Sequence, residues 1–256
     1  MKKIFRFFLK KLPRPWLIRF SNIFTKLIAP FYKGHNVSCP VCGKEYKTFL
    51  PYGYGKGIRD NRLCPGCLTL ERHRLLWLFL KNKTNLFTDK LKLLHIAPEQ
   101  PFYKKFKKMS NIQYITADIE SPIADVKMDI QQIPFEDESF DVVICNHVLE
   151  HVDDDLKAMR EFYRILKKKG WAILQVPIDK NRETTYEDNT IVSPKEREKH
   201  FGQYDHRRVH GRDYGERLKK AGFKVIEDNF VKQFTQDEIN KYRLDKDEII
   251  YFNIKE

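Results

Sequence analysis

The sequence predicts an α/β fold built on a parallel, doubly wound sheet, with two small additions before it. Strand-like and helix-like segments alternate from residue 91 onward, which is typical of a parallel sheet covered by helices. Two C-x-x-C pairs and a basic amphipathic stretch precede this region. A chain of 256 residues suits one such domain with a full core. We therefore expect an arm (1–36), a cysteine module (37–68) and an α/β domain (69–256).

The arm carries most of the net charge of +13. Ten basic residues and no acidic residue lie within residues 1–44, so the rest of the chain is nearly balanced. Residues 2–12 and 16–29 are predicted as helices, and the second helix has one apolar face, made of Trp16, Leu17, Phe20, Ile23, Phe24, Leu27 and Ile28. A basic helix with such a face is typical of a membrane interface, so we expect residues 2–29 to bind an anionic membrane surface. Packing on the protein's own core or on a second subunit is the alternative.

The sequence offers no secretory signal and no membrane span. Arg6 interrupts the first apolar stretch, no small-residue cleavage site follows, and no run of ~18 apolar residues is present. We therefore expect a cytoplasmic location, peripheral on the inner face of the membrane where the arm binds.

The two C-x-x-C pairs predict a structural zinc ribbon. Cys39 and Cys42 form one pair, Cys64 and Cys67 the other, and two such pairs supply four thiolates to one tetrahedral Zn²⁺. No ligand position stays open, so the zinc should be structural. Cys145 lies within an apolar run and is expected to be a core residue.

The α/β domain is expected to begin with a buried helix at 69–80, with His73 on its surface. Further helices are predicted at 101–109, 153–168 and 213–221. The helix at 153–168 has Asp residues at its amino end and Lys residues 167–169 before Gly170 at its carboxyl end. Strands are predicted at 92–97, 113–119, 126–130, 140–146, 171–176, 223–229 and 249–254. Residues 179–211 form a long polar insertion, which favours a functional role on the substrate side.

The stretch 139–152, SFDVVICNHVLEHV, carries a family resemblance. With the flanking IPFEDESFD and ILKKKGWAILQVPI, it resembles motif IV and the following turn of class I S-adenosylmethionine-dependent methyltransferases, in the type 11-like group that acts on small molecules. The resemblance extends from about residue 91 to the C-terminus. It implies a Rossmann-like, seven-stranded sheet whose last strand is antiparallel, and S-adenosylmethionine as cofactor.

The resemblance also implies the cofactor contacts. The glycine-rich first turn of the family aligns with residues 94–99, where no glycine is present. In this turn His95 replaces the usual acid, Ala97 and Pro98 allow close approach, and Glu99 would pair with the methionine ammonium. Asp118 would bind the ribose hydroxyls and Ile119 would pack on the adenine. Asp129 and the Ile130 amide would bind the adenine edge, whereas Asn146 and His147 would line the methionine end. The alternative for Asp118 and Asp129 is that they end strands or cap turns.

The turn Asn146-His147-Val-Leu differs from the Asn/Asp-Pro-Pro-aromatic pattern of enzymes that methylate exocyclic amino groups. Methyl transfer to oxygen needs proton removal, for which a His of near-neutral pKa is suited. His151 occupies the position of a proposed base in related sugar and quinone O-methyltransferases, although a His there could also cap the turn. His206 is the rival, with Arg207, Arg208 and His210 as candidate anchors for an anionic acceptor, and His147 is the third catalytic candidate.

The sequence therefore predicts an S-adenosylmethionine-dependent methyltransferase with a structural Zn²⁺, acting on a small-molecule or on a lipid- or glycan-linked acceptor, by O-methylation. One alternative is a ribosomal or transfer RNA methyltransferase that uses the zinc ribbon to bind RNA. Its basic residues would be expected around the active site rather than in a terminal arm. The other alternative is a non-catalytic scaffold with this fold, suggested by the glycine-free first turn.

Overall fold

The computed structural model describes residues 23–53 and 58–256, which divide into two compact units. The first unit joins the described residues up to Phe87 with Asn229–Glu248, and the second joins Thr88–Asp228 with Ile249–Glu256. Of the predicted arm helices, the first lies outside the described residues, and residues 23–28 of the second are helical. No helix in the described part of the chain is long and apolar enough to cross a bilayer.

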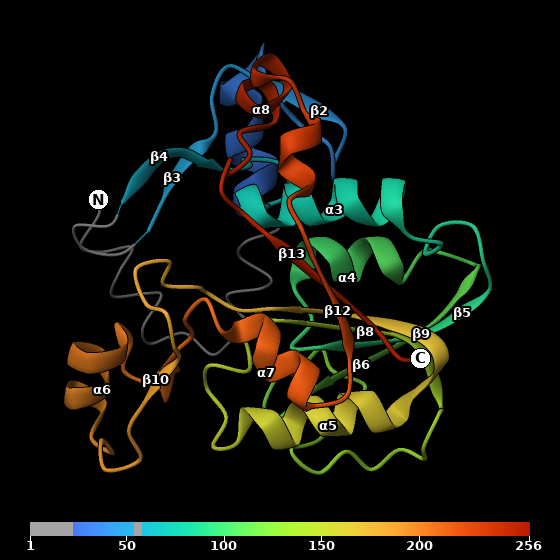
Figure 1. Cartoon of the computed structure of the whole chain (residues 1–256). Coiled ribbons are helices and arrows are strands. Elements are labelled where there is room, and N and C mark those ends of the chain that lie inside the picture. Colours follow the sequence, from blue (N-terminus) through green and yellow to red (C-terminus); the bar gives the residue numbers. More distant parts are fainter. Residues whose placement is uncertain (1–22, 54–57) are drawn as a thin grey trace. The chain divides into compact units, whose positions relative to one another are not determined.

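The second unit contains the predicted seven-stranded sheet (Figure 1). Its strand order is β12-β13-β9-β8-β5-β6-β7, with β13 antiparallel to both β9 and β12 and the other neighbours parallel. The α/β fold class, including the antiparallel last strand, is therefore confirmed. The strands are β5 (Leu91–Ile96), β6 (Ile112–Asp118), β7 (Val126–Lys127), β8 (Phe140–Asn146), β9 (Leu166–Gln175), β12 (Lys224–Asp228) and β13 (Ile250–Ile254).

Helices cover both faces of this sheet. Helix α4 (Gln100–Phe106) lies on one face, and α5 (Asp155–Ile165) and α7 (Tyr214–Lys220) lie on the other (Figure 1). The apolar run in β8 is fully buried, as a central strand covered on both faces requires. Helix α5 begins at its N-cap Asp154, whose side chain accepts a hydrogen bond from the Lys157 amide.

The predicted carboxyl end of α5 was wrong. The helix ends at Ile165, and the basic residues 167–169 belong to strand β9. The strand enters the sheet through an irregular register, with Lys169 at φ 63° and its amide bonded to the Lys255 carbonyl. A side chain on Gly170 would approach the Asp141 carbonyl oxygen to 2.9 Å, so this glycine permits close strand pairing rather than stopping the helix.

The polar insertion at 179–211 is ordered into small elements. It contains β10 (Tyr186–Glu187), α6 (Pro194–Phe201) and β11 (Arg208–Val209), with β10 and β11 paired antiparallel. Helix α6 begins at Ser193, whose hydroxyl accepts a hydrogen bond from the Glu196 amide, and ends at Gly202 in the left-handed conformation.

The first unit combines the cysteine region with two helices distant in sequence. Strand β1 (Lys33–Cys39) pairs with β2 (Lys44–Tyr46), and β3 (Leu50–Tyr52) pairs with β4 (Arg59–Leu63). The unit also contains α3 (Glu71–Lys83), the 3-10 turns η1 (Ala29–Tyr32) and η3 (Phe230–Gln233), and α8 (Gln236–Tyr242). Helix α8 packs on β1, and its Lys241 forms an ion pair with Glu45 of β2 at 2.9 Å.

Arg74 explains why α3 belongs to the first unit rather than to the α/β domain expected from residue 69. Its guanidinium is fully buried and donates hydrogen bonds to the carbonyls of Thr69, Arg62, Tyr242 and Arg243. The expectation of a surface His73 was also wrong, because His73 is buried and its Nδ1 accepts a hydrogen bond from the Leu70 amide.

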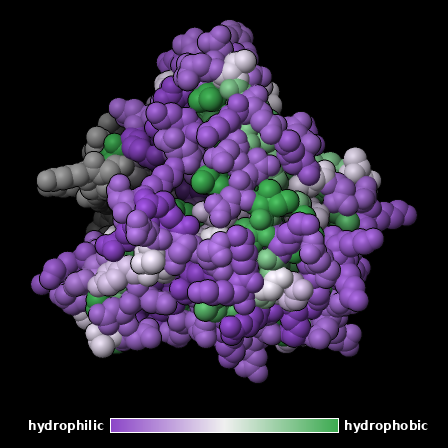
Figure 2. Space-filling view, viewed as in Figure 1, coloured by the Kyte–Doolittle hydropathy of each residue, from purple (hydrophilic) through white to green (hydrophobic). Residues whose placement is uncertain are grey.

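The visible face of the molecule is mostly hydrophilic (Figure 2), in keeping with 32% charged residues. Among the described residues, the most exposed apolar side chains include Phe31, Leu27 and Ile23, which are 75%, 63% and 52% exposed. All three lie in the part of the arm that the structure describes.

Candidate functional site

The candidate site lies where the chain order of the sheet reverses. Strand β5 is flanked by the parallel strands β6 and β8, and open α/β sheets bind ligands beyond the carboxyl ends of strands at such a point. A cavity of about 270 Å³ is found there. Six predicted site residues line it: Ala97, Asp118, Ile119, Asp129, Ile130 and His151.

Asp118 is held firmly at the end of β6. Its side chain is buried, and Oδ1 accepts hydrogen bonds from the amides of Glu120 and Ser121, both at 2.7 Å. The turn-capping role considered for this residue is thus present for one oxygen. The other oxygen, Oδ2, takes part in neither bond and can accept from a ligand hydroxyl. Ile119 follows with 69% of its surface exposed, which offers an apolar face to a flat ring.

Asp129 and Ile130 are positioned through Gln131. The Asp129 carboxylate accepts hydrogen bonds from the Gln131 amide at 2.8 Å and from its side chain at 3.2 Å. The Gln131 Oε1 in turn accepts a hydrogen bond from the Asp154 amide at the start of α5. Gln131 and Asp153 also line the cavity and were missed as site residues from the sequence.

Five predicted cofactor residues of the first turn and the methionine end do not line this cavity: His95, Pro98, Glu99, Asn146 and His147. His95, Glu99 and Asn146 form a polar network beside it. The Asn146 Nδ2 donates to Glu99 Oε2 at 2.8 Å, and the buried His95 ring lies 3.7 Å from the same oxygen. Buried Asn146 Oδ1 has no hydrogen-bond partner among the described residues. A ligand amino group is the type of partner that this network lacks.

The turn that follows β5 has no glycine, yet its backbone adopts a conformation that glycine favours. Ala97 has φ +46°, in the left-handed region that glycine occupies most easily, and its amide donates to the Ala117 carbonyl at 2.8 Å. His147, at the end of β8, also has a positive φ of 55°. Two strained residues thus lie at the ends of adjacent strands, which is common at functional sites.

The three predicted catalytic histidines gather around Glu150. This carboxylate is 2% exposed, and its Oε1 lies 3.5 Å from His147 Nδ1 and 4.0 Å from His151 Nε2. His151 Nδ1 lies 3.4 Å from Asp205, and the His151 and His206 ring centroids are 4.7 Å apart. Glu150 was not predicted, because nothing in the sequence indicates that its side chain is buried among histidines.

Burial alone would raise the pKa of Glu150, but hydrogen bonding to His147 and the nearby His147 and His151 lower this pKa overall. Burial is also the main reason that the pKa of His206 is lowered. These shifts favour an ionised carboxylate at Glu150 and a neutral imidazole at His206, which can accept a proton or bind a metal.

Arg208 and His210 were predicted from the sequence as anchors for an anionic acceptor. The structure contradicts this prediction, because both side chains are buried. Arg208 is 1% exposed and donates to the carbonyls of Leu149, Val152 and Asp153, which fixes the turn after β8. His210 is fully buried. Arg207 alone of the predicted group reaches the cavity, where it pairs with Asp153.

The four predicted zinc ligands are brought together in the first unit. The Cys39 and Cys67 sulfurs are 3.5 Å apart, and those of Cys42 and Cys64 are 3.8 Å apart. Four sulfurs bound to one ion at ~2.3 Å in a tetrahedron lie about 3.8 Å from one another, so the cluster fits such an ion. Thr69 Oγ1 lies 3.1 Å from the Cys39 sulfur, and hydrogen bonds from the other three thiols lower the pKa of Cys39.

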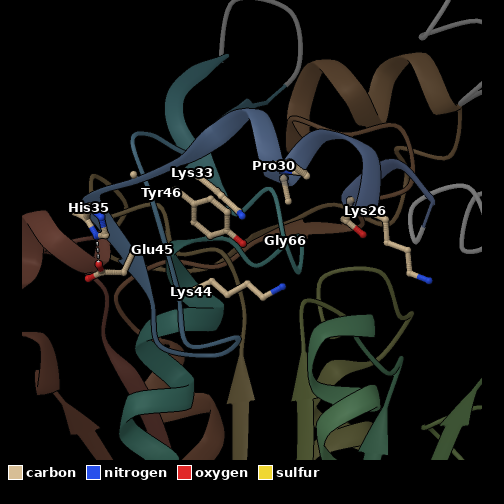
Figure 3. A pocket seen from close by; sticks show the side chains of 11 residues that line it. Lys26, Pro30, Lys33, His35, Lys44, Glu45, Tyr46 and Gly66 are labelled. Atoms are coloured by element: carbon tan, nitrogen blue, oxygen red, sulfur yellow. Dashed lines mark hydrogen bonds and ion pairs between the residues drawn. The ribbon is translucent and has the colours of Figure 1, made fainter.

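A second cavity of about 620 Å³ lies in the first unit beside the cysteine cluster (Figure 3). Its lining includes Lys26, Lys33 and Lys44, together with Gly66 of the second C-x-x-C pair. Tyr46 points its hydroxyl toward Gly66, whose lack of a side chain leaves room for it (Figure 3). Three lysines and one carboxylate, Glu45, are among the lining residues, so the lining is basic overall and favours an anionic ligand.

The match to a known protein family lies in the second unit. Residues 93–174 match the model of the methyltransferase domain family Methyltransf_11. An uncharacterized protein of Methanocaldococcus jannaschii is 52% identical over 48 residues, which is 19% of this chain and 21% of that protein. The uncharacterized methyltransferase YcgJ of Bacillus subtilis is 41% identical over 44 residues, 17% of each chain. The alignments thus span about a fifth of these relatives.

Among solved structures, the [4+2]-cyclase SpnF superposes with a TM-score of 0.50 at 14% identity, covering 91% of this chain and 95% of that chain. This likeness shows a shared fold. The family match covers most of the stretch from β5 to β9, whose strands surround the cavity. Residues 93–174 of this chain are therefore similar in sequence to a methyltransferase domain and lie in the seven-stranded sheet described above.

Proposed function

We propose that the protein transfers a methyl group from S-adenosylmethionine to an oxygen atom of a small-molecule acceptor or of a lipid- or glycan-linked one. The observation that carries this proposal is the cavity at the switch point, where the fixed Asp118 carboxylate, the exposed Ile119 and Asp129 converge. These groups match the parts of a nucleoside: hydroxyls, a flat ring and a polar ring edge. Glu99 and Asn146 lie near them for the amino group of the methionine part.

When bound, S-adenosylmethionine supplies an electrophilic methyl group on a sulfonium. The residues of this chain hold and orient its parts and remove the proton of the acceptor hydroxyl. His151 lines the cavity, and His147, His206 and Glu150 surround it, so the proton is accepted within this cluster. Arg207 at the cavity attracts an acceptor that carries negative charge.

The cofactor assignment is tested by Asp118→Asn, measured by calorimetric titration with S-adenosylmethionine. The Asn carbonyl oxygen can still accept the two turn hydrogen bonds, whereas its amide group cannot accept from a ribose hydroxyl. We expect affinity to fall by about 1.5–3 kcal/mol, the loss typical of hydrogen bonds to a charged group. Glu120→Gln is the matched control, because Glu120 is exposed in the same turn and outside the cavity.

Unchanged affinity of a folded Asp118→Asn variant would count against the assignment. The non-catalytic alternative has its own outcome in this experiment. A protein that binds S-adenosylmethionine but releases no S-adenosylhomocysteine with any acceptor tried would support a scaffold.

The arm, residues 2–29, binds an anionic membrane surface in this proposal and places the protein on the inner face of the membrane. Its support is the high exposure of Ile23 and Leu27 within a segment that has no acidic residue. Ile23→Ser with Leu27→Ser removes about 1–2 kcal/mol of burial per side chain, so cosedimentation with anionic vesicles should fall at least tenfold. Binding equal to that of the unchanged protein would exclude this role for the two residues.

RNA is the second candidate acceptor, favoured by the lysine-lined cavity beside the four-cysteine cluster (Figure 3). If RNA binds there, Lys33→Glu with Lys44→Glu should abolish RNA binding and leave the affinity for S-adenosylmethionine unchanged. The Ile23 and Leu27 variants keep every charge, so the two pairs of substitutions separate RNA from membrane binding.

A further inference from the structure

The Glu150 carboxylate is a buried charge whose contacts with the neighbouring histidines are long. It is 2% exposed, and Oε2 has no hydrogen-bond partner among the described residues. The nearest histidine nitrogens lie 3.5 and 4.0 Å from Oε1, at or beyond the limit of a good hydrogen bond. A buried carboxylate is strongly destabilising unless a charge or several donors compensate it. A cation beside Glu150 would supply that compensation.

Two imidazoles converge on the same point from distant parts of the chain. His151 follows Glu150 directly, whereas His206 comes from the segment between α6 and β11. One ligand atom each of Glu150, His151 and His206 lies within 4.8 Å of the other two. Atoms that bind one ion at about 2.0–2.2 Å lie about 3–4 Å apart, so a small movement of the two half-buried rings would close the set.

The surroundings of His151 resemble those of a metal ligand. Its Nε2 faces Glu150, and its Nδ1 faces the Asp205 carboxylate at 3.4 Å. A carboxylate on the second ring nitrogen orients a ligating imidazole and raises its basicity. Apart from the four cysteines, this is the only group of potential ligands that converges in this way within residues 23–53 and 58–256.

We propose that Glu150, His151 and His206 bind a divalent transition-metal ion. Two imidazoles and one carboxylate suit Zn²⁺, Fe²⁺ or Co²⁺ better than Mg²⁺ or Ca²⁺, which prefer oxygen ligands. Three protein ligands leave coordination positions open for other molecules.

The open coordination positions give the ion a role in catalysis. This role rests on the proposed methyl transfer. His151 lines the cavity, so an acceptor there can place an oxygen on the metal. The metal would lower the pKa of the bound hydroxyl, and His147, the histidine of the cluster that is not a ligand, would accept its proton. The resulting oxygen anion attacks the methyl carbon, the carbon–sulfur bond breaks, and its electron pair stays on sulfur. No oxidation state changes. An acceptor with two neighbouring oxygens, such as a vicinal diol, would fill two positions.

Cobalt binding tests the site without any measurement of activity. The full-length protein is dialysed briefly against chelator until one zinc remains per chain, and is then titrated with Co²⁺ and followed by visible absorption. We expect one further Co²⁺ per chain, with the weak bands of nitrogen and oxygen ligation. Strong thiolate charge-transfer absorption would instead place the cobalt on the cysteines and overturn the proposal.

The variants locate the ion. His206→Ala should weaken Co²⁺ binding at least tenfold, and Glu150→Gln should do the same. The affinity of the His206→Ala variant for S-adenosylmethionine confirms that it is folded. The matched control is His200→Ala, because His200 also lies next to a carboxylate, Glu196 at 3.5 Å, but without a second histidine. Co²⁺ binding by His206→Ala at the unchanged affinity, or no stoichiometric binding by the unchanged protein, would refute the site whether or not the protein transfers methyl groups.

Discussion

At the scale of single residues, Ala97 shows how the first turn functions without glycine. The left-handed conformation is disfavoured for a residue with a Cβ by about 1–2 kcal/mol, yet Ala97 adopts it where the chain leaves β5 for α4. The surrounding contacts, including the Ala97 amide bonded to the Ala117 carbonyl, hold it there. The absence of glycine from the sequence therefore does not mean that the turn differs.

Ala97→Gly should relieve this strain. The gain is partly offset by the greater freedom of glycine in the unfolded chain, so we expect the free energy of unfolding to stay equal or rise by up to about 1 kcal/mol. Chemical denaturation measures it. The matched control is Ala117→Gly in strand β6, which has no strain to relieve and should lose about 1 kcal/mol. Equal losses in both variants would show that Ala97 is not strained.

His210 predicts a dependence of stability on pH. It is fully buried, both ring nitrogens lack hydrogen-bond partners among the described residues, and burial lowers its pKa to about 3. Nearby Glu150 raises this pKa, whereas Arg208 and Arg217 lower it. Between pH ~6.5 and 3 the unfolded chain carries a proton on His210 that the folded chain lacks. The free energy of unfolding should therefore decrease as the pH is lowered from ~6.5 to 3.

Between pH 7 and 4, His210 should lower the free energy of unfolding by an amount on the order of 3 kcal/mol. His210→Phe should remove it, because the ring packs against Tyr214 and no hydrogen bond is lost. Denaturation midpoints from pH 7 to 4 measure the effect, and a parallel decline in both proteins would contradict it.

At the scale of elements, the buried Arg74 on α3 connects distant parts of the first unit through hydrogen bonds to four carbonyls. Arg74→Lys keeps the charge but replaces a planar fork with a single ammonium, which cannot reach all four carbonyls. We expect a loss of about 2–4 kcal/mol, since buried acceptors are left without donors. Arg72→Lys on the same helix is the control and should change stability little, and a similar loss there would contradict the assignment.

The sequence predicted the elements whose pattern is local and missed those set by distant contacts. The apolar runs located β5, β6 and β8, and the residues at their ends located the cavity. Strand β9 begins at Leu166 and includes three lysines, because Leu166 pairs with Phe140 of β8 and the Lys169 amide bonds to the distant Lys255 carbonyl. No local pattern indicates this pairing. Helix α8 was missed, although Thr235 and Glu238 form a capping box that the sequence displays.

In the candidate site, too, residues marked by a local pattern could be predicted and those brought in by distant contacts could not. Asp118, Ile119 and Asp129 could be predicted, because the ends of parallel strands meet at one edge of a sheet. The convergence of His206 on Glu150 and His151 could not, because it depends on the ordered insertion and on Arg208, which binds carbonyls more than 50 residues away.

At the scale of the whole molecule, the metal of the four-cysteine cluster should stabilise one unit only. Purified protein should contain about one tightly bound zinc per chain, and Cys64→Ser should lose it and destabilise the first unit. Calorimetry should then show the loss or shift of one transition, while the second unit keeps its affinity for S-adenosylmethionine. Cys145→Ala in β8 is the control and should retain its zinc, whereas a zinc-free unchanged protein would refute the site.

The division of the chain into interleaved units has a consequence for synthesis on the ribosome. Residues up to Phe87 emerge first, but Asn229–Glu248, which completes their unit, emerges only after strand β12. The sheet in turn still lacks β13, which follows this segment and separates β12 from β9. The first unit can therefore close only after Glu248 has left the ribosome, and the sheet of the second only after Ile254 has done so. Folding of the nascent chain must then be late, although its first domain is made early.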